Sequence, residues 1–250
     1  MARRCGRLSS RCVVRARDRA VVEWGAERAR VASWRGDPHL AYLAPIPEGP
    51  PPSTDFLRRC VDRLSSQGFD SVVTPALSPA EQRPFLAAGF EPHERLHLLA
   101  HDLLELPPRR RAATRRARRR DRRRVLAVDG AAFAPFWRLD GAGLTEALRA
   151  VPTTRFRVAP GRGGAPLGYA ISGRAGRQGY LQRLAVDPAH QGQGHGQVLV
   201  ADALHWMRKP GVARAVVNTQ LGNEAALALY GRLGFRLQPS GLAVLRRALR

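Results

Sequence analysis

The sequence predicts a mixed α/β fold (α+β in its order), in which a mostly antiparallel sheet is flanked by helices, built as two tandem copies. In the second half, three strand-like runs separated by glycine turns precede a helix, a strand, a second helix and two strands. The first half repeats part of this order. Because helices and strands do not alternate one to one, the pattern favours this layered fold over a doubly wound one.

The elements of the second half follow from periodicity and turn residues. Helices are predicted from apolar positions at helical spacing, and Gly234 ends the last of them. The first is expected to carry the end of the arginine block on its exposed face and residues 125–128 and 133–137 on its apolar face. The others are expected at residues 144–150, from the glycine loop up to Pro210, and from residue 224 to the stop at Gly234. Glycine turns and apolar runs predict the strands. These are expected at residues 155–159, 166–172, 179–186, 213–219, 235–237 and 242–249.

The first half contains the same anchors in weaker form. Strands are expected at residues 21–24, 30–34 and 40–43, and a helix at 54–65. Two pairs of segments then match in order. Residues 68–74 resemble residues 211–218, and residues 85–90 resemble residues 230–235. This order indicates an internal duplication.

The two halves differ where a ligand would bind. The second half has Gln-Gly-Gln-Gly-His-Gly at residues 191–196, between a strand and a helix. Glycine lets the backbone approach a ligand, and the first amides of a helix lack acceptors, so the loop suits a pyrophosphate. The first half has prolines at residues 50–52, which remove amide donors, and Phe85 in place of Tyr230.

Composition limits the classes of protein. Hydrophobic residues make up 44% of 250 residues, enough for a packed core. No run reaches the roughly 18 apolar residues of a membrane span, so no membrane association is expected and a cytoplasmic location is the default. The three cysteines, Cys5, Cys12 and Cys60, have no metal-ligand spacing, so neither a metal site nor a disulfide framework is expected.

The net charge of +22 comes almost wholly from arginine, since Lys209 is the only lysine. Arginine occupies 11 of the 16 positions from Arg109 to Arg124. This block favours a linker with an exposed helix face, or a non-specific polyanion-binding arm. The sequence thus predicts a degenerate domain at residues 1–106, a linker at 107–120 and a second domain at 121–250.

Two motifs in the second half resemble those of the GNAT acetyltransferase superfamily. The family loop reads Gln/Arg-x-x-Gly-x-Gly/Ala, which here is Gln191, Gly194 and Gly196. Residues 223–235 resemble the motif that follows it in the family. The layout is similar to tandem GNAT proteins of the mycothiol synthase type. The resemblance implies the GNAT fold, with acetyl-CoA as co-substrate bound by the second copy.

The resemblance also assigns roles to individual residues. Backbone groups of the loop would bind the pyrophosphate, those at the end of the preceding strand would pair with the pantetheine arm, and Asn223 would contact that arm. Tyr230 would be the catalytic acid that protonates the departing thiolate. The cofactor-binding residues are Leu184, Ala185, Val186, Gln191, Gly192, Gln193, Gly194, His195, Gly196 and Asn223.

Each assignment has a structural alternative. Tyr230 also falls on the apolar stripe of its helix and suits a core tyrosine, while Asn223 suits a helix N-cap. His195 suits a solvated loop side chain, and Asp187 a turn residue. The general base is unassigned, because Gln182 stands where many relatives have glutamate.

The remaining candidates for the base are Glu146, Asp187 and a water chain that ends on a backbone carbonyl. We therefore expect an N-acetyltransferase that acts on a primary amine by direct attack on the thioester, with an acceptor that the sequence does not identify. Two alternatives stay open. One is an acyl-CoA-sensing protein of the same fold without catalysis, and the other is an arginine-rich module that binds nucleic acid or the ribosome.

Overall fold

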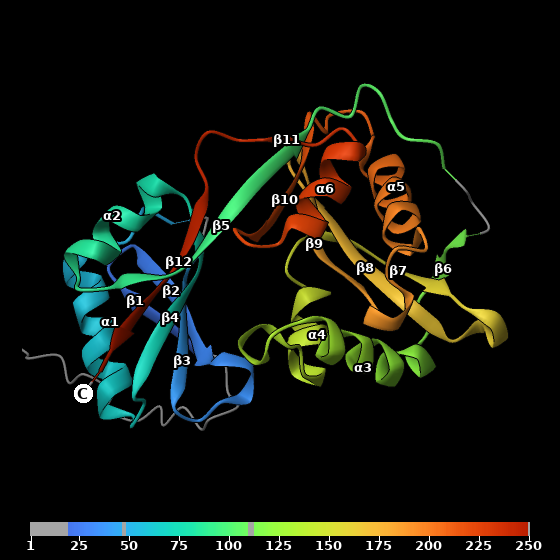
Figure 1. Ribbon diagram of the computed structural model, residues 1–250. Helices are drawn as coiled ribbons and strands as arrows, with labels where there is room; N and C mark the ends of the chain where they lie inside the picture. Colours follow the sequence, from blue (N-terminus) through green and yellow to red (C-terminus); the bar gives the residue numbers. More distant parts are fainter. Residues whose placement is uncertain (1–19, 47–48, 110–112, 250) are drawn as a thin grey trace, which may run out of the picture. The chain divides into compact units, whose positions relative to one another are not determined.

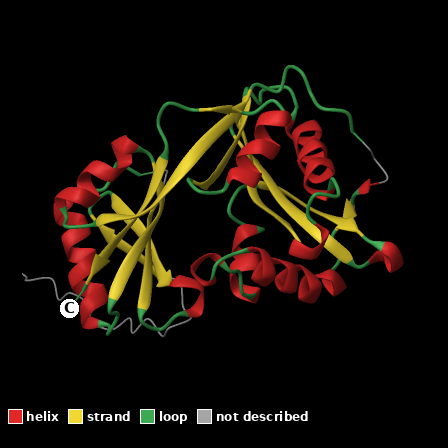
Figure 2. Cartoon of the chain, viewed as in Figure 1, coloured by secondary structure: helices red, strands yellow, loops and turns green. Residues whose placement is uncertain are grey.

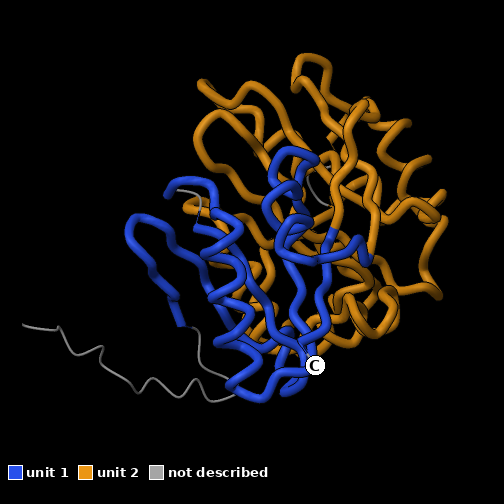
Figure 3. The backbone as a smooth tube through the Cα atoms, turned by 90° about the vertical axis from the view of Figure 1, so that its left-hand side faces the viewer, with its two compact units in different colours: residues 1–93, 244–250 blue, residues 94–243 orange. Residues whose placement is uncertain are grey.

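The structure is a computed structural model that describes residues 20–46, 49–109 and 113–249. The chain forms two compact units (Figure 3). Unit 1 takes in residues 1–93 and 244–250, and unit 2 takes in residues 94–243. The chain therefore passes between units twice, within strands β5 (Glu91–His101) and β12 (Leu242–Ala248). Compactness does not test the predicted domain limits of 1–106, 107–120 and 121–250, which stay a prediction.

Unit 1 is a sheet with two helices. The sheet has the order β1-β2-β3-β4-β12, in which β3 and β4 run parallel and β1, β2 and β3 antiparallel. Helix α1 buries Phe56, Leu57, Cys60, Val61 and Leu64, the face expected from the sequence. The elements are β1 (Ala20–Trp24), β2 (Glu27–Ser33), β3 (Leu40–Pro45), α1 (Thr54–Ser66), β4 (Ser71–Leu77) and α2 (Pro79–Ala87).

Unit 2 has the sheet order β5-β10-β9-β8-β7-β6, and the short strand β11 (Arg236–Leu237) also pairs with β5. Its other strands are β6 (Arg115–Arg116), β7 (Thr153–Pro160), β8 (Pro166–Ala175), β9 (Gln178–Val186) and β10 (Arg214–Gln220). Only β9 and β10 are parallel among these pairs. The predicted mixed, mostly antiparallel sheet with flanking helices is confirmed (Figure 2).

Helices cover both faces of the unit 2 sheet (Figure 1). One face carries α3 (Arg122–Ala132) and α4 (Gly141–Ala147), with a core around Val125, Leu144 and Tyr169. The other carries α5 (His195–Met207) and α6 (Glu224–Arg232), with a core around Leu199 and Tyr230. The two clusters account for the apolar stripes of the sequence.

The structure repeats the anchors that indicated a duplication. Gly68 and Gly211 both have a φ of 88°, in the left-handed region that favours glycine. In each half, a later helix also ends at a glycine with a positive φ, and the same backbone hydrogen bond closes both helix ends. The Phe90 amide donates to the Phe85 carbonyl at 3.0 Å, and the Phe235 amide donates to the Tyr230 carbonyl at 3.0 Å. The matching helix ends support the tandem layout.

Two local predictions differ from the structure. Helix α4 begins at Gly141 and not at residue 144, because the Asp140 carboxylate caps it by accepting from the Gly143 amide at 2.6 Å. Arg115 and Arg116 form a strand paired with β7, since they lie opposite Val158 and Arg157. Part of the arginine block is therefore built into the sheet.

Candidate active site

The glycine loop of unit 2 has the geometry of an anion cradle. Gly192 and Gly194 have φ values of 76° and 84°, and Gly194 caps α5 without a side chain. Among the described residues, nothing accepts from the amides of residues 192–197. These donors at the N-terminus of a thirteen-residue helix suit a pyrophosphate.

Beside this loop, the two parallel strands of the sheet separate. Strand β10 pairs with β9 only from Arg214 opposite Gln178 to Val216 opposite Tyr180. From Leu181 onward, β9 has no partner on its β10 side among the described residues. An open strand edge can pair with an extended ligand such as a pantetheine arm.

A β-bulge at Gln182 accompanies this separation. Ile171 of β8 lies opposite Arg183, and Ser172 lies opposite Leu181, so Gln182 is the extra residue on β9. Leu181 belongs to the core under α5, whereas Arg183 bonds to Asp129 of α3 on the other face. Because a bulge bends its strand and re-aims side chains, it explains both the change of face and the divergence.

The end of β9 provides the three residues predicted to line the pantetheine. Leu184 packs against the core under α5 and α6, and Ala185 belongs to the core under α3. Val186 lies opposite Gly168 of β8, and its carbonyl accepts from the Gln191 side chain at 3.3 Å. That bond closes the loop onto the strand. Gln193 is exposed, and His195 and Gly196 are half-buried at the start of α5.

Tyr230 is buried on α6, with 5% of its surface exposed. Its ring packs against Phe235 with centroids 5.5 Å apart, so the predicted core role is present. Its hydroxyl bonds to no residue in the described part of the chain. Burial raises the pKa of Tyr230, because the phenolate would lose its hydration. The phenol is therefore protonated at neutral pH, as a proton donor must be.

Asn223 has a structural task at the start of α6. Its Oδ1 accepts from the Ala226 amide at 3.1 Å, which makes it the N-cap. It lies seven residues before Tyr230, two turns of helix, so both occupy the same side of α6. The cap does not test the predicted contact with the pantetheine, and the roles predicted for all these residues stay predictions.

Asp187 is the turn residue that the sequence suggested. Its Oδ1 accepts from the Ala189 amide at 3.1 Å, and Arg124 donates to Oδ2 at 2.5 Å. The hydrogen bond from the Ala189 amide and then the Arg124 guanidinium lower the pKa of Asp187, although burial acts to raise it. A carboxylate held ionised in this way is a weak base. Gln182 has a buried Oε1 without a hydrogen-bond partner among the described residues, but its amide cannot accept a proton from an ammonium.

A buried polar network behind the bulge was missed from the sequence. Asp129 on α3 is fully buried, accepts from Arg183 Nε at 2.8 Å and from the Leu139 amide at 2.6 Å, and also bonds to the Tyr169 hydroxyl. Arg183 lies beside Gln182, so the network fixes the bulge to α3. In the sequence, a signal of this network was the acidic residue Asp129, which directly follows the apolar Val128 within the helix.

The arginine block divides into paired and exposed members. Arg109, Arg115 and Arg124 bond to Asp202, Asp121 and Asp187 respectively. The exposed members are Arg116, Arg118, Arg119, Arg120, Arg122 and Arg123. The residues at 110–112 lie outside the described residues.

Two absences apply to the described part of the chain only. Within it, no cluster of His, Cys, Asp and Glu side chains could hold a metal ion. No described helix combines the length and the apolar character needed to cross a bilayer.

In unit 1 the start of the corresponding helix, α1, already binds a carboxylate of the same unit. The Glu27 carboxylate accepts from the amide of Ser53, the N-cap of α1, and from the Ser53 hydroxyl at 3.0 Å. A carboxylate thus lies where unit 2 presents unpaired amides.

Comparison with known sequences finds a family match within unit 2. Residues 150–235 match the family described as Acetyltransferase (GNAT) family. The predicted resemblance of the second half to the GNAT family is confirmed over these residues, and the fold of a solved tandem GNAT protein supports the tandem layout.

Similar proteins cover only parts of the chain. A mycothiol acetyltransferase of Rhodococcus erythropolis is 36% identical over 67 residues, which are 27% of this chain and 22% of that protein. The N-alpha-acetyltransferase RimI of Mycobacterium tuberculosis is 41% identical over 78 residues, which are 30% of this chain and 48% of that protein. The matched segments thus span less than half of these relatives.

Solved structures match nearly the whole chain in fold. A tandem GNAT protein from the clavulanic acid biosynthesis pathway has a TM-score of 0.63 at 13% identity, and the match covers 92% of this chain and 82% of that one. A GCN5-related N-acetyltransferase from Kribbella flavida has a TM-score of 0.60 at 17% identity, covering 94% and 90%. At these identities the likeness concerns the fold alone.

Proposed function

We propose that unit 2 binds acetyl-CoA and transfers its acetyl group to a primary amine. The observation that carries the proposal is the junction of an open β9 edge with a loop whose amides find no acceptor among the described residues. The names of relatives that act as acetyltransferases support the reaction class. The acceptor is a small-molecule or protein amine.

The residues present fit the proposed co-substrate. Amides of residues 192–197 would bind the pyrophosphate, and the free edge of Leu184, Ala185 and Val186 would pair with the pantetheine arm. Acetyl-CoA supplies an acyl group activated as a thioester. The Tyr230 hydroxyl donates a proton to the departing sulfur, a step for which its raised pKa keeps it protonated.

The acceptor amine attacks in its neutral form, because among the described residues the bulge offers no side chain suited to deprotonate it. As the C–N bond forms and the C–S bond breaks, the nitrogen loses its proton to solvent, and solvent returns a proton to the Tyr230 oxygen. Gln182 is an amide, and Arg124 holds Asp187 ionised. Positioning beside the thioester then supplies most of the acceleration. With any amine acceptor, the rate of transfer should rise with pH up to the pKa of that amine.

The test is thermal stabilisation by acetyl-CoA in a matched pair of glycine variants. Gly194 and Gly211 both have positive φ, of 84° and 88°, and an added Cβ would meet nothing within 4 Å at either. Alanine at each costs about 1–2 kcal/mol of backbone strain. Only Gly194→Ala should lose the stabilisation, because only Gly194 shapes the loop. No stabilisation of the unmodified chain by any acyl-CoA would refute the proposal.

A second candidate function, binding of a polyanion, is favoured by the exposed arginines of residues 116–123. Such binding depends on salt, because each phosphate contact releases counterions. Replacing Arg118, Arg119 and Arg120 by glutamine should weaken binding of single-stranded RNA and reduce its salt dependence. Binding that does not change with salt would contradict this candidate.

A further inference from the structure

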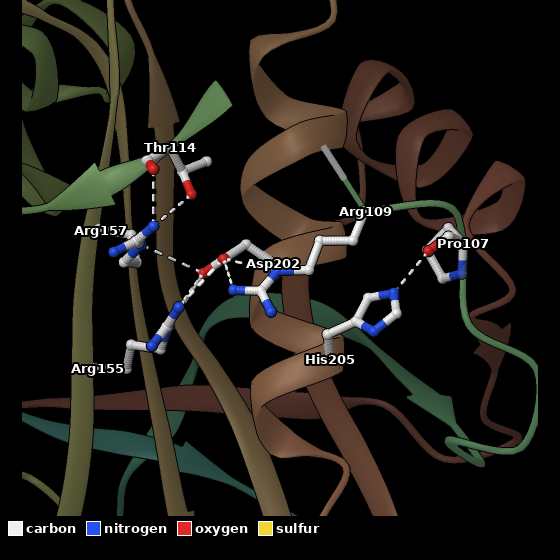
Figure 4. Close-up of polar contacts among 7 residues, drawn as sticks. All are labelled: Pro107, Arg109, Thr114, Arg155, Arg157, Asp202 and His205. Carbon is white, nitrogen blue, oxygen red and sulfur yellow. Dashed lines mark hydrogen bonds and ion pairs between the residues drawn. The ribbon is translucent and has the colours of Figure 1, made fainter. Parts of the chain in front are cut away.

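Three arginines of unit 2 converge on one carboxylate, that of Asp202 on α5, which is 2% exposed (Figure 4). Arg109 donates to its Oδ1 from Nε at 3.2 Å and from Nη2 at 2.7 Å. From β7, Arg155 donates from Nε to Oδ2 at 3.0 Å and from Nη2 to Oδ1 at 3.1 Å. The Nε of Arg157 lies 3.4 Å from Oδ2. We call these four residues the Asp202 cluster.

The charges of the Asp202 cluster do not balance. In the described part of the chain, Asp202 is the only acid paired with these arginines. The side chains of Arg109, Arg155 and Arg157 are only 27%, 23% and 18% exposed. Two positive charges are therefore left partly dehydrated without a counterion, which costs free energy.

Arg157 shows the imbalance most directly. Its Nη2 donates to the carbonyl and hydroxyl oxygens of Thr114 at 2.7 and 2.9 Å, but its Nε is buried with no hydrogen bond among the described residues. Burial lowers the pKa of Arg157, and repulsion from Arg155 and Arg109 opposes the attraction of Asp202. A second anion at this place would pair with the excess positive charge of the three arginines.

Further positive charge adjoins the cluster. Arg116 of β6 is the direct partner of Arg157 across the sheet, and it is exposed. On β8, Arg174 lies over the Trp206 ring with its guanidinium carbon 4.1 Å from the centroid. Trp206 follows Asp202 by one helical turn. An anion in solvent is drawn toward this part of unit 2.

We propose that the Asp202 cluster is a phosphate-binding site separate from the loop at residues 191–196. Guanidinium groups match the oxygens of phosphate in pairs, and the Nη1 atoms of the three arginines bond to no described residue. Asp202 lies seven residues after His195, about 10 Å along α5. The phosphate group belongs either to a small phosphorylated molecule or to a polynucleotide backbone.

An anchoring role alone does not account for this arrangement. Arg109 and the bond from His205 to the Pro107 carbonyl, at 2.9 Å, fix the segment before the cluster to α5 (Figure 4). One arginine paired with Asp202 would suffice for that purpose. The second and third bring charge that the anchor does not need.

The test is thermal unfolding of the full chain in inorganic phosphate and in sodium chloride of equal ionic strength. Phosphate should raise Tm by about 3 °C more than chloride does. Arg155→Gln and Arg157→Gln should lose this difference, with the Tm of each variant in chloride as its own reference, because both substitutions also remove structural hydrogen bonds. Arg149→Gln, at an exposed arginine of the same unit, should retain it.

Two results would overturn the proposal. One is a phosphate effect no larger than that of chloride. The other is a phosphate effect that survives in Arg157→Gln but disappears in Gly194→Ala, since phosphate would then bind at the loop. Stabilisation by acetyl-CoA in Arg157→Gln is measured in parallel, so that failure of the proposed function is seen separately.

A labelled single-stranded RNA separates the two sources of the phosphate group. RNA binding that is weakened by Arg157→Gln and displaced by phosphate identifies a polynucleotide backbone. Stabilisation by phosphate that depends on Arg157, without RNA binding, identifies a small phosphorylated ligand. Both outcomes support the site.

Discussion

The Glu27 carboxylate accepts hydrogen bonds from both the amide and the hydroxyl of Ser53, at the first turn of α1. In unit 2 the equivalent turn, at Gly194, has no such side chain. Unit 1 therefore carries its own anion at the position where the loop of unit 2 has unpaired amides. We predict that each chain binds one acetyl-CoA, as measured by isothermal titration calorimetry.

Removing the internal carboxylate tests this explanation. Glu27→Gln should lower the free energy of unfolding by about 1 kcal/mol, because a charged acceptor at a helix start is lost. The binding stoichiometry should stay at one, because the prolines at residues 50–52 still withhold amides. Two molecules bound per chain, before or after the substitution, would contradict the interpretation of unit 1 as degenerate.

Tyr230→Phe should lower kcat for acetyl transfer by about 100-fold, since the proton donor is removed. The KM for acetyl-CoA and the Tm should change little, because the hydroxyl bonds to no described residue and the ring packing against Phe235 is kept. Thiol release measured with a reactive amine checks the rate. Unchanged kcat would favour the acyl-CoA-sensing alternative or a different proton donor.

His101 should make the stability of the protein depend on pH. It is 2% exposed, its Nδ1 accepts from the Leu103 amide at 2.9 Å, and burial lowers its pKa. An unfolded histidine titrates near a pKa of about 6.5. The contribution of His101 is therefore complete above that pH and is lost as the pH falls below it, because the unfolded chain then binds the extra proton.

Urea unfolding at pH 7.5 and pH 5.5 measures this effect. In His101→Asn the side-chain oxygen can still accept from the Leu103 amide, but the titrating ring is gone. The loss of unfolding free energy between the two pH values should be smaller in the variant. An equal loss in both proteins would assign the pH dependence to other groups.

A fragment of residues 121–250 should fail to fold, because it lacks part of the unit 2 sheet. Strand β5 pairs along β10 from Leu96 opposite Gln220 to His101 opposite Ala215, and Leu99 belongs to the core under α6. A fragment of residues 94–243 retains these elements. Circular dichroism and cooperative thermal unfolding compare the two. A folded 121–250 fragment would instead support the predicted domain limits.

Local patterns in the sequence were sufficient to predict the strands β7, β8 and β9, the glycine loop and the helix that carries Tyr230. Each of these depends on periodicity or on turn residues within a short window. The duplication was also visible, because Gly68 and Gly211 must adopt the same backbone conformation.

Features that depend on partners far along the chain were not predicted. The bulge at Gln182 is defined by its register with β8, and the Asp129 network joins residues 54 positions apart. Of the three acids paired with the arginine block, Asp121 lies within it, but Asp187 and Asp202 follow it by many residues. The sequence predicted a linker with an exposed helix face or a polyanion-binding arm, whereas the structure pairs Arg109, Arg115 and Arg124 with acids.

The passage of the final strand into unit 1 constrains when that unit can mature during synthesis. The Leu245 amide donates to the Thr74 hydroxyl at 2.9 Å across 171 positions, and the Leu249 amide donates to the Asp70 carbonyl at 2.9 Å. The ribosome makes Thr74 long before Leu245, and pairing across so many residues closes slowly. The edge of β4 therefore stays uncovered until β12 has emerged from the ribosome, and in that interval the nascent chain is exposed to strand pairing with its neighbours.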